Sequence, residues 1–98
     1  MDVYVNVRKV GKHVTLAVCD VGVLGKRLKH GNTVFHISEK FYKGSLVYLD
    51  EALDLIQQSS IVNMVGCNIV KKAVEKGLVH SEAVIDIEGV PHAQIVKL

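Results

Sequence analysis

The sequence contains no tryptophan, one proline, and only two phenylalanines and three tyrosines among its 98 residues. With so few rings, a hydrophobic core has to be built from aliphatic side chains, of which valine is especially abundant. Valine is stiff at χ1, and its branched side chain packs well on the pleated surface of a strand. The composition therefore predicts a domain with much β-structure.

Long apolar runs are missing, and cysteine is scarce. No stretch approaches the roughly eighteen apolar residues of a membrane span, and no charged start precedes an apolar run as in a signal peptide. We therefore expect no membrane partner and a cytoplasmic location. Cys19 and Cys67 lie far apart and outside any CxxC spacing, so we expect reduced, half-buried thiols whose reactivity stays open.

The short motifs that carry common chemistries are absent. There is no GxxxxGK[ST] phosphate loop, no GxGxxG after a strand, no HExxH and no GxSxG. The five histidines and two cysteines show no metal-binding spacing, so we expect no metal and no cofactor. A catalytic Cys–His pair stays open as an alternative, because such partners meet in space and not in sequence.

The residues that are present fit one α+β domain spanning residues 1–98. The hydrophobic fraction of 49% can fill one core, and the charged fraction of 22% is ordinary for a globular surface. Alternating apolar residues predict a hairpin in the first twenty residues, a third strand at 32–37 and a hairpin over about 83–97. We expect a mainly antiparallel sheet with two helices packed on one face.

Both helices are expected between Leu49 and Lys76, where apolar residues recur at helical spacing. Gly66 interrupts this stretch, so we expect two helices that meet near it. Residues 20–31 hold three glycines and are expected to form a turn or a short helical turn.

A basic stretch follows these glycines. The net charge of +2 does not by itself require a nucleic-acid partner, but clustered positive charges would form a phosphate-binding patch. Next to Lys43, Tyr42 adds a ring on which a base could stack. The plain alternative is a solvated surface. The basic residues are Lys26, Arg27, Lys29 and His30, followed by Lys40 and Lys43.

A second group of polar residues indicates a small pocket. His92 and Gln94 alternate with Ala93 and are expected to share one face of the last strand. Asn63 lies among apolar residues, where an unpaired amide would cost roughly 1–3 kcal/mol. The alternative is that Asn63 bonds nearby backbone groups and that the other two merely line a sheet edge.

Four segments resemble a family of short archaeal single-domain proteins classed as a domain of unknown function. They are Leu24-Gly25-Lys26, residues 37–44 (ISEKFYKG), Asn63-Met64-Val65-Gly66 and the GVPHAQIV ending at residues 89–96. The resemblance covers nearly the whole chain and implies a free-standing cytoplasmic domain of archaeal origin. It brings no established activity and no catalytic residue. The small stand-alone form suggests a role near translation.

Two functions follow from these observations. The first is a binding module that docks on RNA or on a protein of the translation or RNA-processing machinery. The second is a small enzyme or ligand-binding protein that uses Asn63, His92 and Gln94, with Cys19 and Asp20 as further candidates. Convergence of Asn63, His92 and Gln94 in a concave pocket would favour the second function. Basic residues gathered on one face would favour the first. The oligomeric state cannot be read from the sequence.

Overall fold

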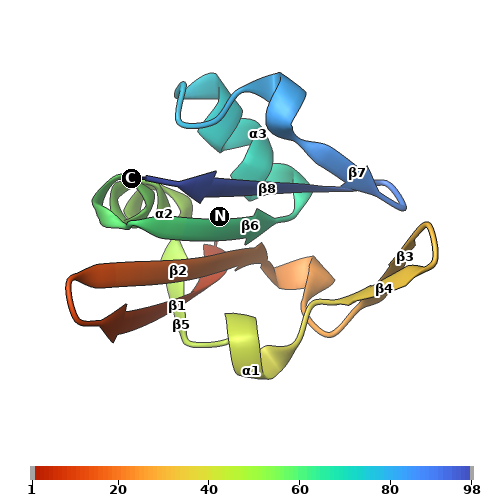
Figure 1. The fold of residues 1–98 in the computed structure, drawn as a ribbon, viewed down its shortest axis with the longest axis horizontal. Helices are drawn as coiled ribbons and strands as arrows, with labels where there is room; N and C mark the ends of the chain where they lie inside the picture. Colours follow the sequence, from red (N-terminus) through yellow and green to blue (C-terminus); the bar gives the residue numbers. More distant parts are fainter. Residues whose placement is uncertain (1, 98) are drawn as a thin grey trace.

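The structure is a computed structural model that describes residues 2–97, and within them the chain forms a six-stranded sheet, three α-helices and a projecting two-stranded hairpin (Figure 1). We call the projecting hairpin the arm. No helix in this range is long and apolar enough to cross a membrane. In chain order the elements are β1 (Asp2–Val10), β2 (His13–Asp20), the 3-10 turn η1 (Val21–Val23), β3 (Arg27–His30), β4 (Thr33–His36), α1 (Glu39–Tyr42), β5 (Ser45–Tyr48), α2 (Leu49–Gln58), β6 (Ile61–Val65), α3 (Cys67–Glu75), the 3-10 turn η2 (Ser81–Ala83), β7 (Ile85–Ile87) and β8 (Val90–Val96).

The strands of the sheet run in the order β5-β1-β2-β6-β8-β7. The central pair, β2 and β6, is parallel, and the other neighbours are antiparallel. The predicted α+β class and mainly antiparallel sheet are confirmed, as are the two terminal hairpins. The N-terminal hairpin turns at Gly11, whose φ of 59° suits glycine.

Helices α2 and α3 pack on the same face of the sheet, as predicted. The core on that side contains Ala52 and Ile56 from α2, Ile69 from α3, and Val18 and Met64 from the sheet, all with almost no exposed surface. The opposite face, which we call the open face, is covered only in part, by α1 and the base of the arm. A smaller apolar cluster lies there (Ala17, Cys19, Leu28, Ile37, Tyr42, Val65 and Ile87).

The predicted helical half was wrong in its middle, because Ile61–Val65 is the strand β6 and separates α2 from α3. Val62 and Met64 face the core beneath the helices, while Val65 joins the cluster on the open face. A central strand that is apolar on both sides hides its period of two, and periodicity alone cannot distinguish it from a buried helix. The two helices therefore do not meet near Gly66.

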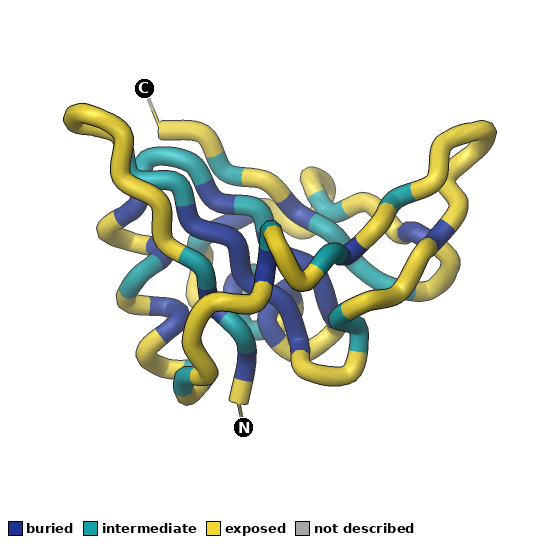
Figure 2. Tube along the Cα trace, turned by 90° about the horizontal axis from the view of Figure 1, so that it is seen from below, coloured by how far each residue is buried: buried dark blue, intermediate teal, exposed yellow. Residues whose placement is uncertain are grey.

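The segment from residue 20 to residue 37 also differs from the prediction. Arg27–His30 is a strand and not a turn, and it pairs with Thr33–His36 to form the arm. The expected third strand thus belongs to the arm and lies outside the main sheet. Figure 2 shows that the arm is exposed along most of its length. The edge strand Ser45–Tyr48 was not predicted at all.

Candidate functional site

The open face carries three amide side chains in a row that crosses four strands, with an alanine at the fourth position. Asn6 is paired in register with Ala17, Ala17 with Asn63, and Asn63 with Gln94. The next row on the same face passes through Tyr4, Cys19, Val65 and His92. Because side chains on one face of a sheet repeat every two residues, His92 and Gln94 project to the same side, as predicted, while Ala93 is buried on the other.

Helix α1 and strand β4 lie over this face and leave a hollow of about 260 Å³ against the sheet. Asn63 and His92 both line it, so the structure brings together two of the three residues predicted for a polar pocket. Gln94 is the register partner of Asn63 but is exposed and does not line the hollow. The lining residues are Phe35, His36, Phe41, Tyr42, Asn63 and His92.

The polar side-chain groups of Asn63 and His92 in this hollow are free to bind a ligand. No side-chain hydrogen bond joins Asn63 or His92 to any other residue between 2 and 97, and no buried polar side-chain atom in this range lacks a partner. Their polar atoms therefore reach solvent. The His92 ring makes an edge-on contact with Phe35, with 4.9 Å between ring centres, and partial burial lowers the pKa of His92. Its imidazole is therefore neutral at pH 7, with one donor and one acceptor.

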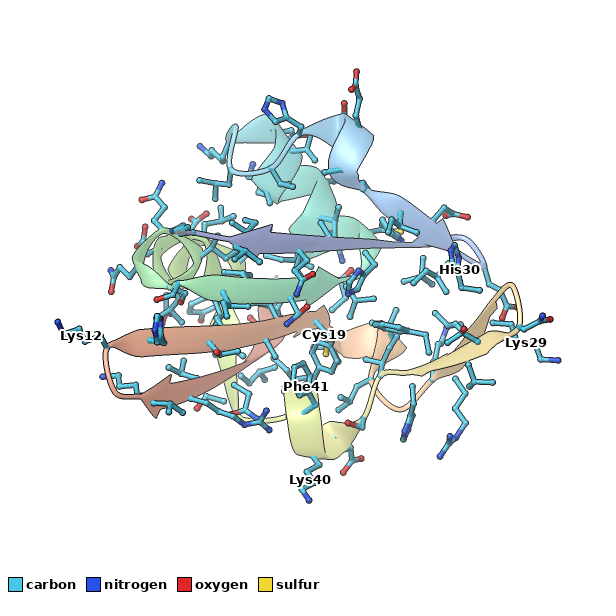
Figure 3. The ribbon with its side chains drawn as sticks, viewed as in Figure 1. Lys12, Cys19, Lys29, His30, Lys40 and Phe41 are labelled. Atoms are coloured by element: carbon cyan, nitrogen blue, oxygen red, sulfur yellow. The ribbon has the colours of Figure 1, made fainter. Side chains whose placement is uncertain are left out.

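A second hollow, of about 400 Å³, lies beside the first and is lined by Arg8, Ser38, Lys40 and Phe41. Phe41 lines both hollows, and the Arg8 guanidinium carbon lies 5.0 Å from the centre of its ring. In Figure 3, Phe41 points from α1 towards the sheet, whereas Lys40 points away from it. Arg8, and not Lys40, is therefore the cation that contacts this ring.

Helix α1 is held in place through its backbone carbonyls. The Arg8 guanidinium donates to the carbonyl oxygen of Lys40 (2.9 Å), and the Asn6 amide donates to that of Phe41 (3.0 Å). Ser38 caps the helix by accepting from the Phe41 N–H (3.2 Å). These bonds fix the helix backbone, so the position of the Phe41 ring does not depend on contacts of the ring alone.

Tyr42 does not offer the stacking ring that the sequence suggested. It is only 2% exposed, and its burial raises its pKa to about 12. Phe41, its neighbour in α1, is the half-buried ring that faces the hollows. The sequence could not rank the two, because which of two adjacent rings turns inward depends on how the single turn of α1 docks on the sheet.

The predicted basic patch is divided. Arg27 and Lys29 belong to the arm and Lys26 lies just before it, whereas Lys40 and Lys43 belong to α1 and its C-terminal end; all five are exposed. Figure 3 shows Lys29 and His30 at the far end of the arm, well away from Lys40.

The arm is bound to the body both at its base and near its far end. Gly25 and Ile37 are joined by a backbone hydrogen bond of 2.7 Å, and Leu28 is buried. The Glu88 carboxylate, in the turn between β7 and β8, accepts a hydrogen bond from the backbone N–H of Lys29. The arm therefore presents its basic side chains from an anchored support.

Cys19 and Asp20 do not join the polar pocket. Burial, followed by the charge of Asp20, raises the pKa of the Cys19 thiol to about 12, so it is not an activated nucleophile. The Asp20 carboxylate accepts from the N–H groups of Asn68 (2.8 Å) and Ile69 (3.0 Å) and so caps the first turn of α3. Cys67 is exposed at the start of α3, and neither cysteine is paired.

Sequence reasoning missed several residues that line the two hollows, among them Arg8, Phe35 and Phe41. Arg8 continues the alternation of β1, Phe35 reads as an ordinary strand residue, and Phe41 reads as a core anchor. They approach one another only when β1, β4 and α1 come together in the fold. No local signal in the sequence could have identified them.

Comparison with known proteins agrees with the resemblance noted in the sequence. Residues 8–98 match the family described as Protein of unknown function (DUF424). Among solved structures, the chain is similar to one described as the crystal structure of an uncharacterized conserved protein from Methanopyrus kandleri. The two are 31% identical with a TM-score of 0.80, over 97% of this chain and 90% of that one. A search of curated proteins finds no match. The resemblance to a family without an established activity, with an archaeal relative, is confirmed.

Proposed function

Because this chain belongs to DUF424, a family of proteins of unknown function, its own residues have to indicate its role, and we propose that it is a module that binds single-stranded RNA. The observation that carries the proposal is the position of Phe41. Its ring stands between a hollow lined by Asn63 and His92 and a second hollow beside Arg8.

This arrangement matches the parts of a nucleotide. Unpaired bases stack on aromatic rings and bond to amide or imidazole groups along their edges, while phosphates pair with arginine. Phe41 and Phe35 supply the rings, Asn63 and His92 supply the edge contacts, and Arg8 supplies the cation. A base in the first hollow would place its phosphate towards the second.

The distribution of charge supports an anionic ligand on this side. Residues 1–44 hold eight of the twelve Lys and Arg residues but only three of the ten Asp and Glu residues, so residues 45–98 hold four and seven. The arm and α1 come from the basic part. Of the helices on the other face, α2 carries three acidic residues and no basic one, whereas α3 carries Lys71 and Lys72 beside Glu75. A negative polymer is therefore drawn to the arm and repelled from α2.

A second candidate function is the binding of a small free ligand, with or without catalysis, in the same hollow. It is favoured by the unengaged polar groups of Asn63 and His92. Against it stands the size of the hollow, because about 260 Å³ is below the roughly 300–1,000 Å³ of pockets that enclose drug-sized molecules. A shallow hollow suits one base of a longer chain better than a whole enclosed ligand.

The cytoplasmic location expected from the sequence is part of the RNA proposal.

The test measures binding of labelled twelve-nucleotide single-stranded RNAs, one for each base, by fluorescence anisotropy. Phe41→Leu keeps an apolar side chain but removes the ring, and we expect binding to weaken by about five- to a hundredfold, the range for removal of one stacking ring. Lys12→Ala is the matched control, since Lys12 lies at the far end of the β1–β2 hairpin (Figure 3) and should leave binding unchanged. Unchanged binding by Phe41→Leu, or no binding by the native protein, would reject the proposal.

Two further measurements separate the alternatives. Lys26, Arg27 and Lys29 are replaced together by Ala, and the binding constant is measured at several salt concentrations. The slope of log binding constant against log salt concentration should become shallower by about 0.7 for each phosphate that these residues no longer neutralise. If a mononucleotide binds as tightly as the twelve-nucleotide RNA, the small-ligand function is favoured instead. Affinity purification from the native host with and without nuclease tests the remaining alternative, since a translation-factor partner would be recovered even after RNA is removed.

A further inference from the structure

The two edges of the sheet are protected to very different degrees. Edge strands expose unpaired backbone groups, and proteins usually blunt them with charged side chains, proline, shortness or a covering segment. Strand β7 has only three residues, carries Asp86 at its centre and lies against β3 of the arm. That edge is short, charged and flanked by another element.

Strand β5, at the other edge, is also short, with four residues, but it lacks the charge and the flanking element that protect β7. In the part of the chain that the structure describes, it pairs with β1 alone, and its sequence, Ser-Leu-Val-Tyr, contains neither charge nor proline. Leu46 is 54% exposed and Tyr48 is 66% exposed. An uncharged edge with two large exposed apolar side chains is a template for pairing with another strand.

We propose that β5 pairs antiparallel with β5 of a second copy of this chain. Leu46 and Tyr48 stand opposite Tyr4 and Asp2 of β1, so both project to the open face. A two-fold axis perpendicular to the sheet keeps the faces aligned. It sets Leu46 against Leu46 or Tyr48 of the second copy, so each register buries apolar side chains against each other.

The charges near the ends of β5 favour pairing with β5 of a second copy over pairing with an unrelated strand. Lys43 lies just before the strand, and Asp50 and Glu51 lie just after it. Antiparallel pairing brings the start of one β5 to the end of the other, and therefore Lys43 of one copy towards Glu51 of the second, twice per dimer. A self-paired edge is thus complementary in both apolar contact and charge.

The pairing would join two six-stranded sheets into one continuous sheet, with both Phe41 hollows on the same side. The proposal does not depend on RNA binding, since it rests on the edge alone. A four-residue pairing is small, so we expect weak, concentration-dependent association.

The experiment is sedimentation velocity on the full chain from about 5 to 500 µM, a range that covers weak association. The native protein should move from the mass of one chain, 10.8 kDa, towards twice that mass. Leu46→Lys should weaken dimerisation at least about tenfold, because in either register it replaces an apolar contact at the new interface with a charge in each copy. Ile85→Lys is the matched control, a 48% exposed residue on the opposite edge, and should associate as the native protein does.

A charge exchange keeps the proposal testable if Leu46→Lys fails to fold. Lys43→Glu should weaken association, and Lys43→Glu combined with Glu51→Lys should restore it. Far-ultraviolet circular dichroism shows which variants are folded. The proposal is overturned if the native protein stays at 10.8 kDa throughout, if folded Leu46→Lys associates normally, or if Ile85→Lys alone abolishes association.

Discussion

The two faces of the sheet are built from the same strands but are covered to different degrees. On the helix-covered face, side chains such as Val18, Val62 and Met64 are sealed beneath α2 and α3 and have no exposed surface. On the open face, the neighbouring positions Asn63, His92 and Gln94 hold polar groups that keep contact with solvent. The helix-covered face holds the larger apolar core, and the open face holds a smaller cluster beside its solvent-accessible polar groups.

The difference can be seen within strand β6 alone. Met64 is fully buried, whereas the residue before it, Asn63, lines the hollow. Because successive side chains of a strand point to opposite faces, one position separates a core residue from a candidate ligand contact. Substitutions in this strand therefore test the division directly.

The largest effect is expected for Met64→Ala. Removing a fully buried side chain leaves a cavity, which costs roughly 2–5 kcal/mol in free energy of unfolding. Asn63→Ala should cost less than about 1 kcal/mol, because no side-chain partner within residues 2–97 is left behind. Urea unfolding measures both. Equal losses for the two variants would contradict the division between the faces.

An intermediate effect is expected from acid, acting through His92. Partial burial lowers the pKa of His92 below its ordinary value of about 6.5. Between these two pKa values the unfolded chain binds more protons at this residue than the folded one, so the contribution of His92 to stability falls as the pH drops below about 6.5 and is constant above it. His92→Gln should lack this contribution.

The quantity to measure is the difference in free energy of unfolding between the native protein and His92→Gln, from pH 8 to pH 5. The four other histidines are common to both proteins, so their contributions cancel. We expect the native protein to lose stability relative to the variant on acidification. A difference that does not vary with pH would show that the His92 ring is no less solvated in the folded protein than in the unfolded chain.

The smallest effect on stability is expected for Gln94→Ala, within about 0.5 kcal/mol, because Gln94 is exposed at the end of the amide row. Gln94 does not line the hollow, so RNA binding should weaken less for this variant than for Asn63→Ala. Thermal unfolding and fluorescence anisotropy on the same preparation give both values. A loss of several kcal/mol would instead make Gln94 part of the fold.

The sequence was most informative where one face of an element is apolar and the other polar. The valine alternation of β1 and β2 predicted the first hairpin, and the period of β8 predicted which side His92 and Gln94 share. It failed at Ile61–Val65, which is apolar towards both faces, and at β5, whose four residues are too short to show a period.

The candidate site was predictable only in part, for the same physical reason. Asn63 and His92 could be identified because a polar side chain in an apolar setting needs an explanation. Phe41 and Arg8 could not, since a half-buried ring and a strand arginine are each ordinary by themselves. Their importance comes from an approach of 5.0 Å that only the folded chain creates.

The bond between Glu88 and the arm also bears on how this protein can evolve. The Glu88 carboxylate holds the backbone N–H of Lys29 and not its side chain. Every residue except proline supplies that N–H, so position 29 can change in size, charge or shape without releasing the arm. The attachment of the arm therefore does not depend on which side chain stands at position 29. Substitutions can therefore accumulate at this projecting position during evolution while the hydrogen bond that holds the arm is kept.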